Sequence, residues 1–393
     1  MLQIIHADFC AAGTDEKHML KVIQQLAHRS AAEQALKALG IRYEKKWHGE
    51  LFVRGHLDIT NRGLTELPDL TCVYVGGGFA CDGNRLTSLK GAPQTVAGSF
   101  TCGGNRLTSL KGAPQSVGGS FWCSNNQLAS LEYAPRSIGG DFLCNDNQLT
   151  SLTGAPQSVN EFWCSGNPLT SLAGGPAKVS GAYRCYSAGL SSLEGAPEST
   201  GGDFWCHGNR LTSLQGAPQE VGGSFQCQGN QLASLKDGPR SVNGHFWCHD
   251  NQLTTLEGAP LNVGTDFCCV RNRLTSLNGA PQAVGGHFLC CNNRLISLAG
   301  APQHIRGSFQ CQGNQLASLD QLPSTFKDLT SDFGYFQAWD GVPSALRLSP
   351  EARRQLEEER LAAEQRKVQV VQEATVLQSA IRVSGPLKFR RKP

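Results

Sequence analysis

Cysteine is the residue type in this chain with the widest chemistry, because a thiol can act as a nucleophile, a metal ligand or half of a disulfide. The 393-residue sequence contains 16 cysteines. Twelve of them follow one another at intervals of 21 residues, except that Cys144 and Cys164 are 20 residues apart. The twelve positions are Cys81, Cys102, Cys123, Cys144, Cys164, Cys185, Cys206, Cys227, Cys248, Cys269, Cys290 and Cys311. A spacing this regular indicates a repeated structural position rather than a reactive site.

The motif F-x-C around these cysteines predicts a short strand with Phe and Cys pointing inward and the residue between them pointing outward. We therefore interpret the twelve thiols as reduced, small hydrophobic core residues. No C-x-x-C or C-x-x-H pair recurs in a zinc-like cluster, so the sequence predicts no metal site and no cofactor. Cys268 and Cys291 are predicted to face outward one coil apart, which leaves a disulfide between them open. Cys10 and Cys72 lie outside the pattern.

The cysteine intervals belong to a longer repeat, V-G-G-x-F-x-C-x-x-N-x-L-x-S-L-x-G-A-P. One copy, at residues 159–162, has one residue fewer than V-G-G-x-F, and a looser first copy places Ile59 in the cysteine position. Together these copies give about thirteen coils. The fragment F-x-C-x-x-N-x-L-x-x-L resembles the leucine-rich repeat L-x-L-x-x-N-x-L-x-x-L, with Phe and Cys in the first two apolar positions. It is most similar to the short type, of about 21 residues, found in phage proteins and in secreted bacterial ubiquitin-ligase effectors.

The resemblance covers roughly residues 53–325 and implies a right-handed leucine-rich-repeat solenoid, mainly β with short helices (α/β class), built on a parallel strand ladder. The repeated Asn is expected to hydrogen-bond loop backbone of neighbouring coils, and G-A-P is expected to turn the chain across the convex side. In one coil Ala188 replaces this Asn and Thr200 replaces the usual Val. We predict an irregularity near residues 185–200, where a backbone group loses its partner.

Four segments are predicted: an N-terminal helical cap (1–52), the solenoid (53–325), a C-terminal cap (326–348) and a long helix with a basic tail (349–393). Thr14-Asp15-Glu16 is predicted to cap a helix from His18 to Leu39. Short strands are expected at Ile4-Ile5 and at residues 51–53. The apolar side of the helix is predicted to consist of Leu20, Val22, Ile23, Leu26, Leu36 and Leu39.

After the repeats, Phe333, Tyr335, Phe336 and Trp339 are expected to cover the last coil. A helix is predicted to begin at Ser349-Pro350-Glu351. Its heptad positions are Leu356, Ala363, Val370 and Leu377, with Ala374 and Ile381 four residues further on. This spacing fits either a coiled coil, and hence a homo-oligomer through this helix, or a helix folded back on the solenoid. The basic tail holds Lys388, Arg390, Arg391 and Lys392, which could contact an acidic partner.

Four of the six tryptophans stand in the outward position between Phe and Cys. The exposed strand face is the usual ligand surface of such solenoids, and Trp, Tyr and Arg are enriched where partners dock. The alternative is that Trp, Arg and Trp shield one another through cation–π contacts. The predicted partner-binding residues are Trp122, Trp163, Arg184, Tyr186, Trp205, His207, Trp247 and His249. The histidines there could make binding pH-sensitive or could simply be scattered surface residues.

These features favour a non-enzymatic scaffold that binds a protein, either as a component of a phage particle or as an intracellular bacterial adaptor or effector. A carbohydrate-binding surface is an alternative, since tryptophan faces also suit sugar rings. A ubiquitin-ligase effector is another, but that family needs a nucleophilic cysteine in a domain after the repeats. No cysteine follows Cys311.

Charge and hydropathy limit the classes of partner and the locations that we expect for the protein. A net charge of +3 argues against nucleic acid as a partner, and no apolar run is long enough to span a membrane. The first residues lack a basic lead and an apolar stretch, so we expect no secretory signal. The expected location is the cytoplasm, or a phage particle.

Overall fold

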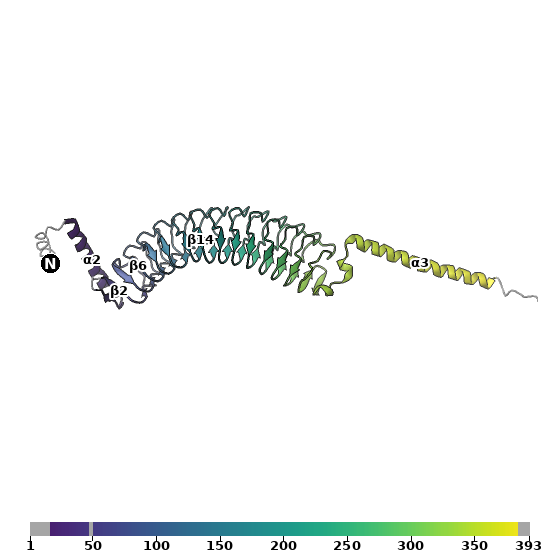
Figure 1. The fold of residues 1–393 in the computed structure, drawn as a ribbon, viewed down its shortest axis with the longest axis horizontal. Coiled ribbons are helices and arrows are strands. Elements are labelled where there is room, and N and C mark those ends of the chain that lie inside the picture. The colour runs from purple at the N-terminus through teal and green to yellow at the C-terminus, as the bar shows by residue number, and fades with distance from the viewer. Residues whose placement is uncertain (1–15, 47–49, 384–393) are drawn as a thin grey trace, which may run out of the picture.

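The computed structural model describes residues 16–46 and 50–383, which form an arc of stacked coils with one helix at each end (Figure 1). The F-x-C motifs form a single parallel ladder, the F-x-C ladder, which lies on the concave side of the arc. Its thirteen strands from the repeats confirm the predicted solenoid and its number of coils. They are β3 (Leu57–Asp58), β5 (Phe79–Ala80), β7 (Phe100–Thr101), β9 (Phe121–Trp122), β11 (Phe142–Leu143), β13 (Phe162–Trp163), β15 (Tyr183–Arg184), β17 (Phe204–Trp205), β19 (Phe225–Gln226), β21 (Phe246–Trp247), β23 (Phe267–Cys268), β25 (Phe288–Leu289) and β27 (Phe309–Gln310).

The core consists of columns of equivalent side chains along the axis, with Tyr183 in place of Phe in one coil. The aromatic rings from Phe79 to Phe309 follow one another with centroids 5.0–5.8 Å apart. The twelve repeated cysteines are also buried, as are the two leucines of each coil except Leu64 and Leu316 in the end coils, and the cysteines are unpaired, as predicted. Burial raises the pKa of these thiols; that of Cys102, for example, lies well above its usual value. The column is therefore hydrophobic filling and not a set of reactive groups.

The repeated asparagines form a second buried column that joins each coil to its neighbours. In a typical coil the Asn126 side-chain amide donates to the carbonyl oxygens of Cys102 and Cys123, both at 3.1 Å. Its Oδ1 atom accepts the backbone N–H of Leu107 at 3.0 Å. These bonds satisfy loop backbone groups that would otherwise be buried without partners, which confirms the predicted role of the asparagines.

The coil without this asparagine is irregular, as predicted, but the predicted loss of a partner is wrong. The N–H of Leu169 donates instead to the backbone carbonyl of Ala188, at 2.8 Å. The next residue, Gly189, adopts a left-handed conformation with φ of 76°, and the N–H groups of Ala188 and Leu190 share Asn209 Oδ1 at 2.9 and 3.1 Å. Glycine permits this turn because it has no Cβ atom. A backbone carbonyl thus replaces the side-chain acceptor.

A second strand, centred on the Val of V-G-G, precedes each F-x-C strand and forms the V ladder. One part holds β1 (Glu44–Lys45), which pairs antiparallel to β2 (Leu51–Val53), then β4 (Val73–Val75), β6 (Thr95–Val96), β8 (Ser116–Val117) and β10 (Ser137–Ile138). The other part holds β12 (Ser158–Val159), β14 (Lys178–Val179), β16 (Ser199–Thr200), β18 (Glu220–Val221), β20 (Ser241–Val242), β22 (Asn262–Val263), β24 (Ala283–Val284) and β26 (His304–Ile305). The division coincides with the coil that is one residue short: Asn160 N–H donates to Gly140 O, whereas the regular Gly139 N–H donates to Val117 O.

The described coils contain turns and no helix on the convex side, so the helices that we expected lie only at the two ends. Helix α2 (Glu16–Ala38) precedes the solenoid, and only the last part of its predicted apolar side is covered. Leu36 is buried and Leu39 packs against the core, whereas Leu20 and Leu26 are 56% and 51% exposed. The cap is therefore formed by the last two turns of the helix. The predicted strand at Ile4-Ile5, the residues Thr14-Asp15 and Cys10 lie outside the described residues.

The other end is closed by strands β28 (Asp328–Ser331) and β29 (Gly334–Gln337), which form an antiparallel hairpin on the last coil. Phe333 and Phe336 pack against the core, but the predicted covering by Tyr335 and Trp339 is wrong, because they are 64% and 40% exposed. The 3-10 helices η1 (Trp339–Gly341) and η2 (Ser344–Arg347) lead to the last helix.

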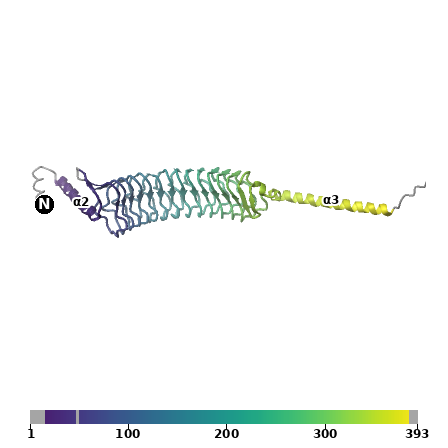
Figure 2. The ribbon, with the colours of Figure 1, turned by 90° about the horizontal axis from the view of Figure 1, so that it is seen from below.

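Helix α3 (Pro350–Val383) begins where the sequence predicts, with Ser349 Oγ accepting the Ala352 N–H at 3.1 Å. The helix projects away from the solenoid in both views (Figures 1 and 2), so it does not fold back on the coils. Leu356 is accordingly 58% exposed. No described helix is long and apolar enough to cross a membrane. The later heptad side chains (Val370, Ala374, Leu377, Ile381) and the basic residues Lys388, Arg390, Arg391 and Lys392 lie outside the described part.

Candidate functional site on the F-x-C ladder

The predicted partner-binding side chains lie together on the outward side of the F-x-C ladder, where strand pairing places Trp163, Arg184 and Trp205 in consecutive coils. Their exposure differs more than the alternation alone predicts. Trp122 is 44% exposed, whereas the other three tryptophans of the column are half-buried. Gln226 and Cys268 in the same column are buried, both at 9% exposure. Neighbouring coils stand so close that large outward side chains cover one another.

Arg184 lies between two indole rings, which is the mutual shielding that the sequence left open. Its guanidinium carbon is 4.5 Å from the Trp163 ring centroid and 4.7 Å from that of Trp205. Glu161 fixes this arrangement, because one carboxylate oxygen accepts both Arg184 Nη1 at 2.5 Å and Trp163 Nε1 at 3.2 Å. We call Glu161, Trp163, Arg184 and Trp205 the arginine sandwich. A cation held between two aromatic faces and paired with a carboxylate stabilises a rigid surface.

A second aromatic pair adjoins the sandwich. The rings of Tyr186 and His207 are stacked, with centroids 4.7 Å apart and planes 6° from parallel. Burial, and secondarily the nearby His249, lower the pKa of His207, so its neutral form is favoured. Among the described residues, the buried atoms without a hydrogen-bond partner include Arg184 Nε, Trp205 Nε1 and His207 Nδ1, all on this part of the face. Unpaired buried donors are costly, which marks this part as one that a bound partner or ordered water can still satisfy.

Trp247 lies two coils further along, between His245 and His249, with ring centroids 5.4 and 6.4 Å away. His249 Nδ1 is 2.6 Å from Asp250 Oδ2, and Arg271 makes a two-pronged ion pair with the same carboxylate. The hydrogen bond from Arg271 is the main reason that the pKa of Asp250 falls to about 2. His249 is therefore tied to a permanently charged carboxylate at ordinary pH.

The residues directly before Phe in each repeat form a further column, whose role was not predicted from the sequence. Its side chains accept the backbone N–H of the same position in the next coil: Ser120 Oγ accepts Asp141 N–H at 3.0 Å, and Asp203 Oδ1 accepts Ser224 N–H at 2.7 Å. His287 Nδ1 does the same for Ser308 N–H at 3.0 Å. The chain bends between its two strands here, so the side chain supplies the acceptor that this N–H needs. The restriction of the column largely to Ser, Asp and His was the available signal.

The two outward cysteines are buried and unpaired, with exposures of 9% for Cys268 and 5% for Cys291. Cys268 and Cys291 lie diagonally to each other on adjacent strands, where backbones are about 7–8 Å apart. This separation is beyond ordinary disulfide reach. Burial raises the pKa of Cys291 to about 11. Neither thiol therefore has the lowered pKa of a reactive cysteine.

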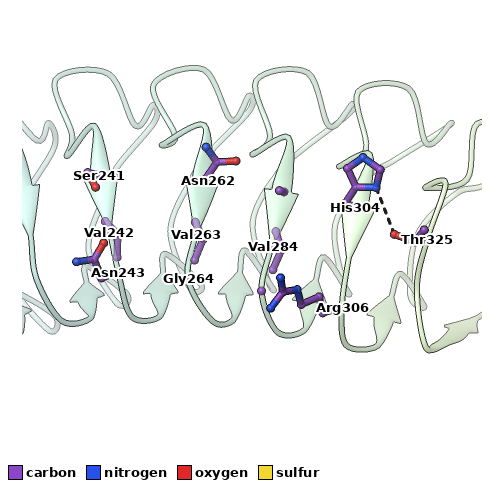
Figure 3. A pocket seen from close by; sticks show the side chains of 12 residues that line it. Ser241, Val242, Asn243, Asn262, Val263, Gly264, Val284, His304, Arg306 and Thr325 are labelled. Carbon is purple, nitrogen blue, oxygen red and sulfur yellow. Dashed lines mark hydrogen bonds between the residues drawn. The ribbon is translucent and has the colours of Figure 1, made fainter.

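Two open depressions accompany the ladders. One, of about 440 Å³, lies where Trp122, Leu143 and Trp163 meet the small residues Gly103 and Gly104. The other, of about 680 Å³, runs along β20, β22, β24 and β26 of the V ladder (Figure 3) and is lined mainly by small or polar side chains. Its end carries Arg306 and His304, whose Nδ1 atom is 3.4 Å from Thr325 Oγ1. Across the residues that the structure covers, no three His, Cys, Asp or Glu side chains could hold a metal ion.

Comparison with known proteins gives matches to solved structures alone. No protein-family model and no curated protein matches the chain. One similar structure is YopM, a leucine-rich effector protein from Yersinia pestis, with 21% sequence identity over 70% of this chain and 82% of that chain and a TM-score of 0.46. Another is YopM from Yersinia enterocolitica WA-314, with 20% identity over 70% of this chain and 78% of that chain and a TM-score of 0.34.

Proposed function

We propose that this protein is a non-enzymatic scaffold that binds a protein partner through the outward side of its F-x-C ladder, the aromatic face. The observation that carries the proposal is the concentration of large aromatic side chains in two adjacent columns of a rigid ladder. The face comprises Trp122, Leu143, Trp163, Arg184, Tyr186, Trp205, His207, Trp247 and His249. Such residues supply most of the binding energy in protein interfaces, and they do so best when held in place beforehand.

The residues of the face have different parts in this proposal. The arginine sandwich is packed against itself, so it supports the surface and presents the edges of its rings. Trp122 is the most exposed indole of the column and borders the 440 Å³ depression, and Trp247 is flanked by two histidines. Trp122 and Trp247 are therefore the proposed anchors, while Tyr186, His207 and His249 supply polar contacts.

A rigid non-catalytic binding surface suits both settings that the sequence suggests, a phage particle and an intracellular bacterial adaptor. The raised pKa values of the outward cysteines Cys268 and Cys291 support a binding role rather than thiol catalysis. A protein is favoured over a sugar because the face combines apolar groups, Leu143 among them, with a guanidinium, that of Arg184, which is already paired within the fold.

The test is a double substitution, Trp122→Ala with Trp247→Ala, in the full chain. Partners are captured from cells of its source with tagged protein and identified by quantitative mass spectrometry. The wild type should retain a specific partner, and the double variant should lose it, because each anchor is worth about 2 kcal/mol or more. The melting temperature should change little, since neither side chain belongs to the buried core.

The matched control is Trp339→Ala, which removes an exposed indole from the C-terminal cap. This variant should keep the partner. Equal capture by the double variant and the wild type would move the binding site away from the aromatic face. A large fall in melting temperature would instead make the column a shielding device.

A further inference from the structure

The part of the aromatic face between Trp122 and Trp205 is acidic, although the whole chain has a net charge of +3. Four carboxylates lie on it and one guanidinium, that of Arg184, so its net charge is −3. The carboxylates belong to Asp141, Asp146, Glu161 and Asp203. Arg184 offers no free charge to a partner, because it is paired with Glu161 and only 13% of its side chain is exposed.

The neighbouring edge of the face offsets only one of these charges. The residue after each repeated Asn forms an exposed column along that edge, and elsewhere it holds both arginines and glutamines. Beside the acidic part the column holds the uncharged Gln127, Gln148, Pro168 and Gly189, and its one cation there is Arg210 in the coil of Trp205. The acidic part also borders the depression in which the apolar side chains of Trp122, Leu143 and Trp163 lie beside glycines and polar residues. A ligand that fits here needs cations and at least one apolar or aromatic side chain.

The same chain contains a segment of that composition. Residues 387–392 read Leu-Lys-Phe-Arg-Arg-Lys, with four cations and one aromatic ring. This segment follows α3, the 34-residue helix that projects from the far end of the solenoid. Its charge complements the acidic part of the face, and Phe389 is of the chemical class that the depression accepts.

The segment cannot reach the face of its own copy. Helix α3 is about 51 Å long at 1.5 Å per residue, and Trp205 lies five coils, or about 24 Å, inside the last coil. The ten residues after α3 span at most about 35 Å when extended. The start of the helix is joined to the last coil, because Arg353 donates to the carbonyls of Leu346 and Leu348, at 3.4 and 3.3 Å, and Leu346 O also accepts the Leu319 N–H at 2.7 Å. Helix α3 therefore directs the basic segment away from its own coils and towards those of another molecule.

We propose that residues 387–392 of one copy bind the acidic part of the aromatic face of a second copy. This inference rests on the proposed function, since it names a partner for the same face. The contact joins two different surfaces, so it repeats from copy to copy and produces an open chain or a closed ring. Because it pairs exposed charges, it weakens as salt rises.

The test is sedimentation velocity on the full chain over a range of concentrations, at low and at high salt. The wild type should form dimers and larger species at low salt and lose them at high salt. A tail variant, Lys388→Ala with Phe389→Ala, Arg390→Ala and Arg391→Ala, should be monomeric under both conditions. The control, Arg85→Ala with Arg106→Ala and Arg294→Ala, removes exposed arginines elsewhere and should assemble like the wild type.

Mixing two variants that are each monomeric alone gives the decisive result. The face variant, Trp122→Ala with Asp146→Asn, changes two exposed side chains and should also be monomeric alone. Mixed with the tail variant it should form a one-to-one dimer, because each supplies the surface that the other lacks. A monomeric wild type at low salt, or a tail variant that still assembles, would overturn the proposal. If Leu377→Glu abolishes assembly while the tail variant and the face variant still assemble, the association is due to pairing of α3 helices instead. Partner capture that depends on Trp122 and Trp247 without any self-association leaves the proposed function standing.

Discussion

At the scale of single residues, the direction of each side chain was predictable and its environment was not. Alternation in F-x-C places Trp163, Arg184 and Trp205 outward, and the structure agrees. The sequence also suggested that an Arg between two Trp could shield them. It did not reveal that Glu161 holds the group together, because the spacing of the repeat does not specify which side-chain atoms of neighbouring coils meet. The half-burial of the indoles likewise depends on packing between coils, which periodicity does not encode.

We predict that Arg184→Ala lowers the free energy of unfolding by about 2 kcal/mol, because it removes two cation–π contacts and leaves the Glu161 carboxylate without its cation. Arg184→Lys should recover only part of this loss, since an ammonium cannot stack flat between two rings. The measurement is urea unfolding, with Arg271→Ala as the control. That residue is in an exposed ion pair and should cost less than about 1 kcal/mol. Equal losses for Arg184→Ala and Arg271→Ala would contradict a stabilising sandwich.

At the scale of the coil, the repeat predicted the strands, the buried columns and the asparagine bonds. The conformation of the coil that lacks Asn was only half predicted. Sequence reasoning treated the Asn side chain as the sole acceptor, whereas Gly189 lets the backbone turn and offer a carbonyl. The first coil uses the same solution, with Gly63 at φ of 69° and the N–H groups of Arg62 and Leu64 on Asn84 Oδ1. The glycine one residue after the missing Asn was the signal.

This comparison predicts a compensating pair. Asn126→Ala should cost at least about 2 kcal/mol, because Leu107 N–H and two carbonyls lose a partner. Adding Gln127→Gly recreates the Ala188-Gly189 sequence and should restore more than about 1 kcal/mol. Gln127→Gly alone should be neutral or destabilising by up to about 1 kcal/mol, as glycine has the more flexible unfolded state. Urea unfolding of the wild type, the two single variants and the double variant gives the coupling free energy between positions 126 and 127. Purely additive losses would mean that glycine does not rebuild the turn at residue 127.

At the scale of the whole molecule, the solenoid followed from the repeat, while its ends did not. Repeats report many equivalent environments at once, whereas each end is a single surface with no second example in the chain. Of the four aromatic residues predicted to cover the last coil, Phe333 and Phe336 pack against the core, whereas Tyr335 and Trp339 are exposed. The heptad spacing from Leu356 onward likewise fitted two arrangements of α3.

The projecting helix α3 predicts a long particle. Thirteen coils at about 4.8 Å span about 60 Å, and α3 adds about 51 Å, so the largest dimension should exceed about 100 Å. Small-angle X-ray scattering on the monomeric tail variant provides the measurement. Truncation of the chain after Ser349 should shorten the particle by nearly the length of the helix. An unchanged dimension after truncation would show that α3 lies along the coils in solution.

The cysteine column has a practical consequence for studying how such an array opens. Every coil from Cys81 to Cys311 holds one thiol at the same depth, and burial raises the pKa of each. A soluble alkylating reagent reaches such a thiol only while its own coil is open. The twelve sulfur atoms are therefore natural reporters, one per coil, that need no engineered label. Mass spectrometry would give the order in which they are modified. That order distinguishes fraying at both ends from an opening that starts beside Cys164, where the V ladder is already divided.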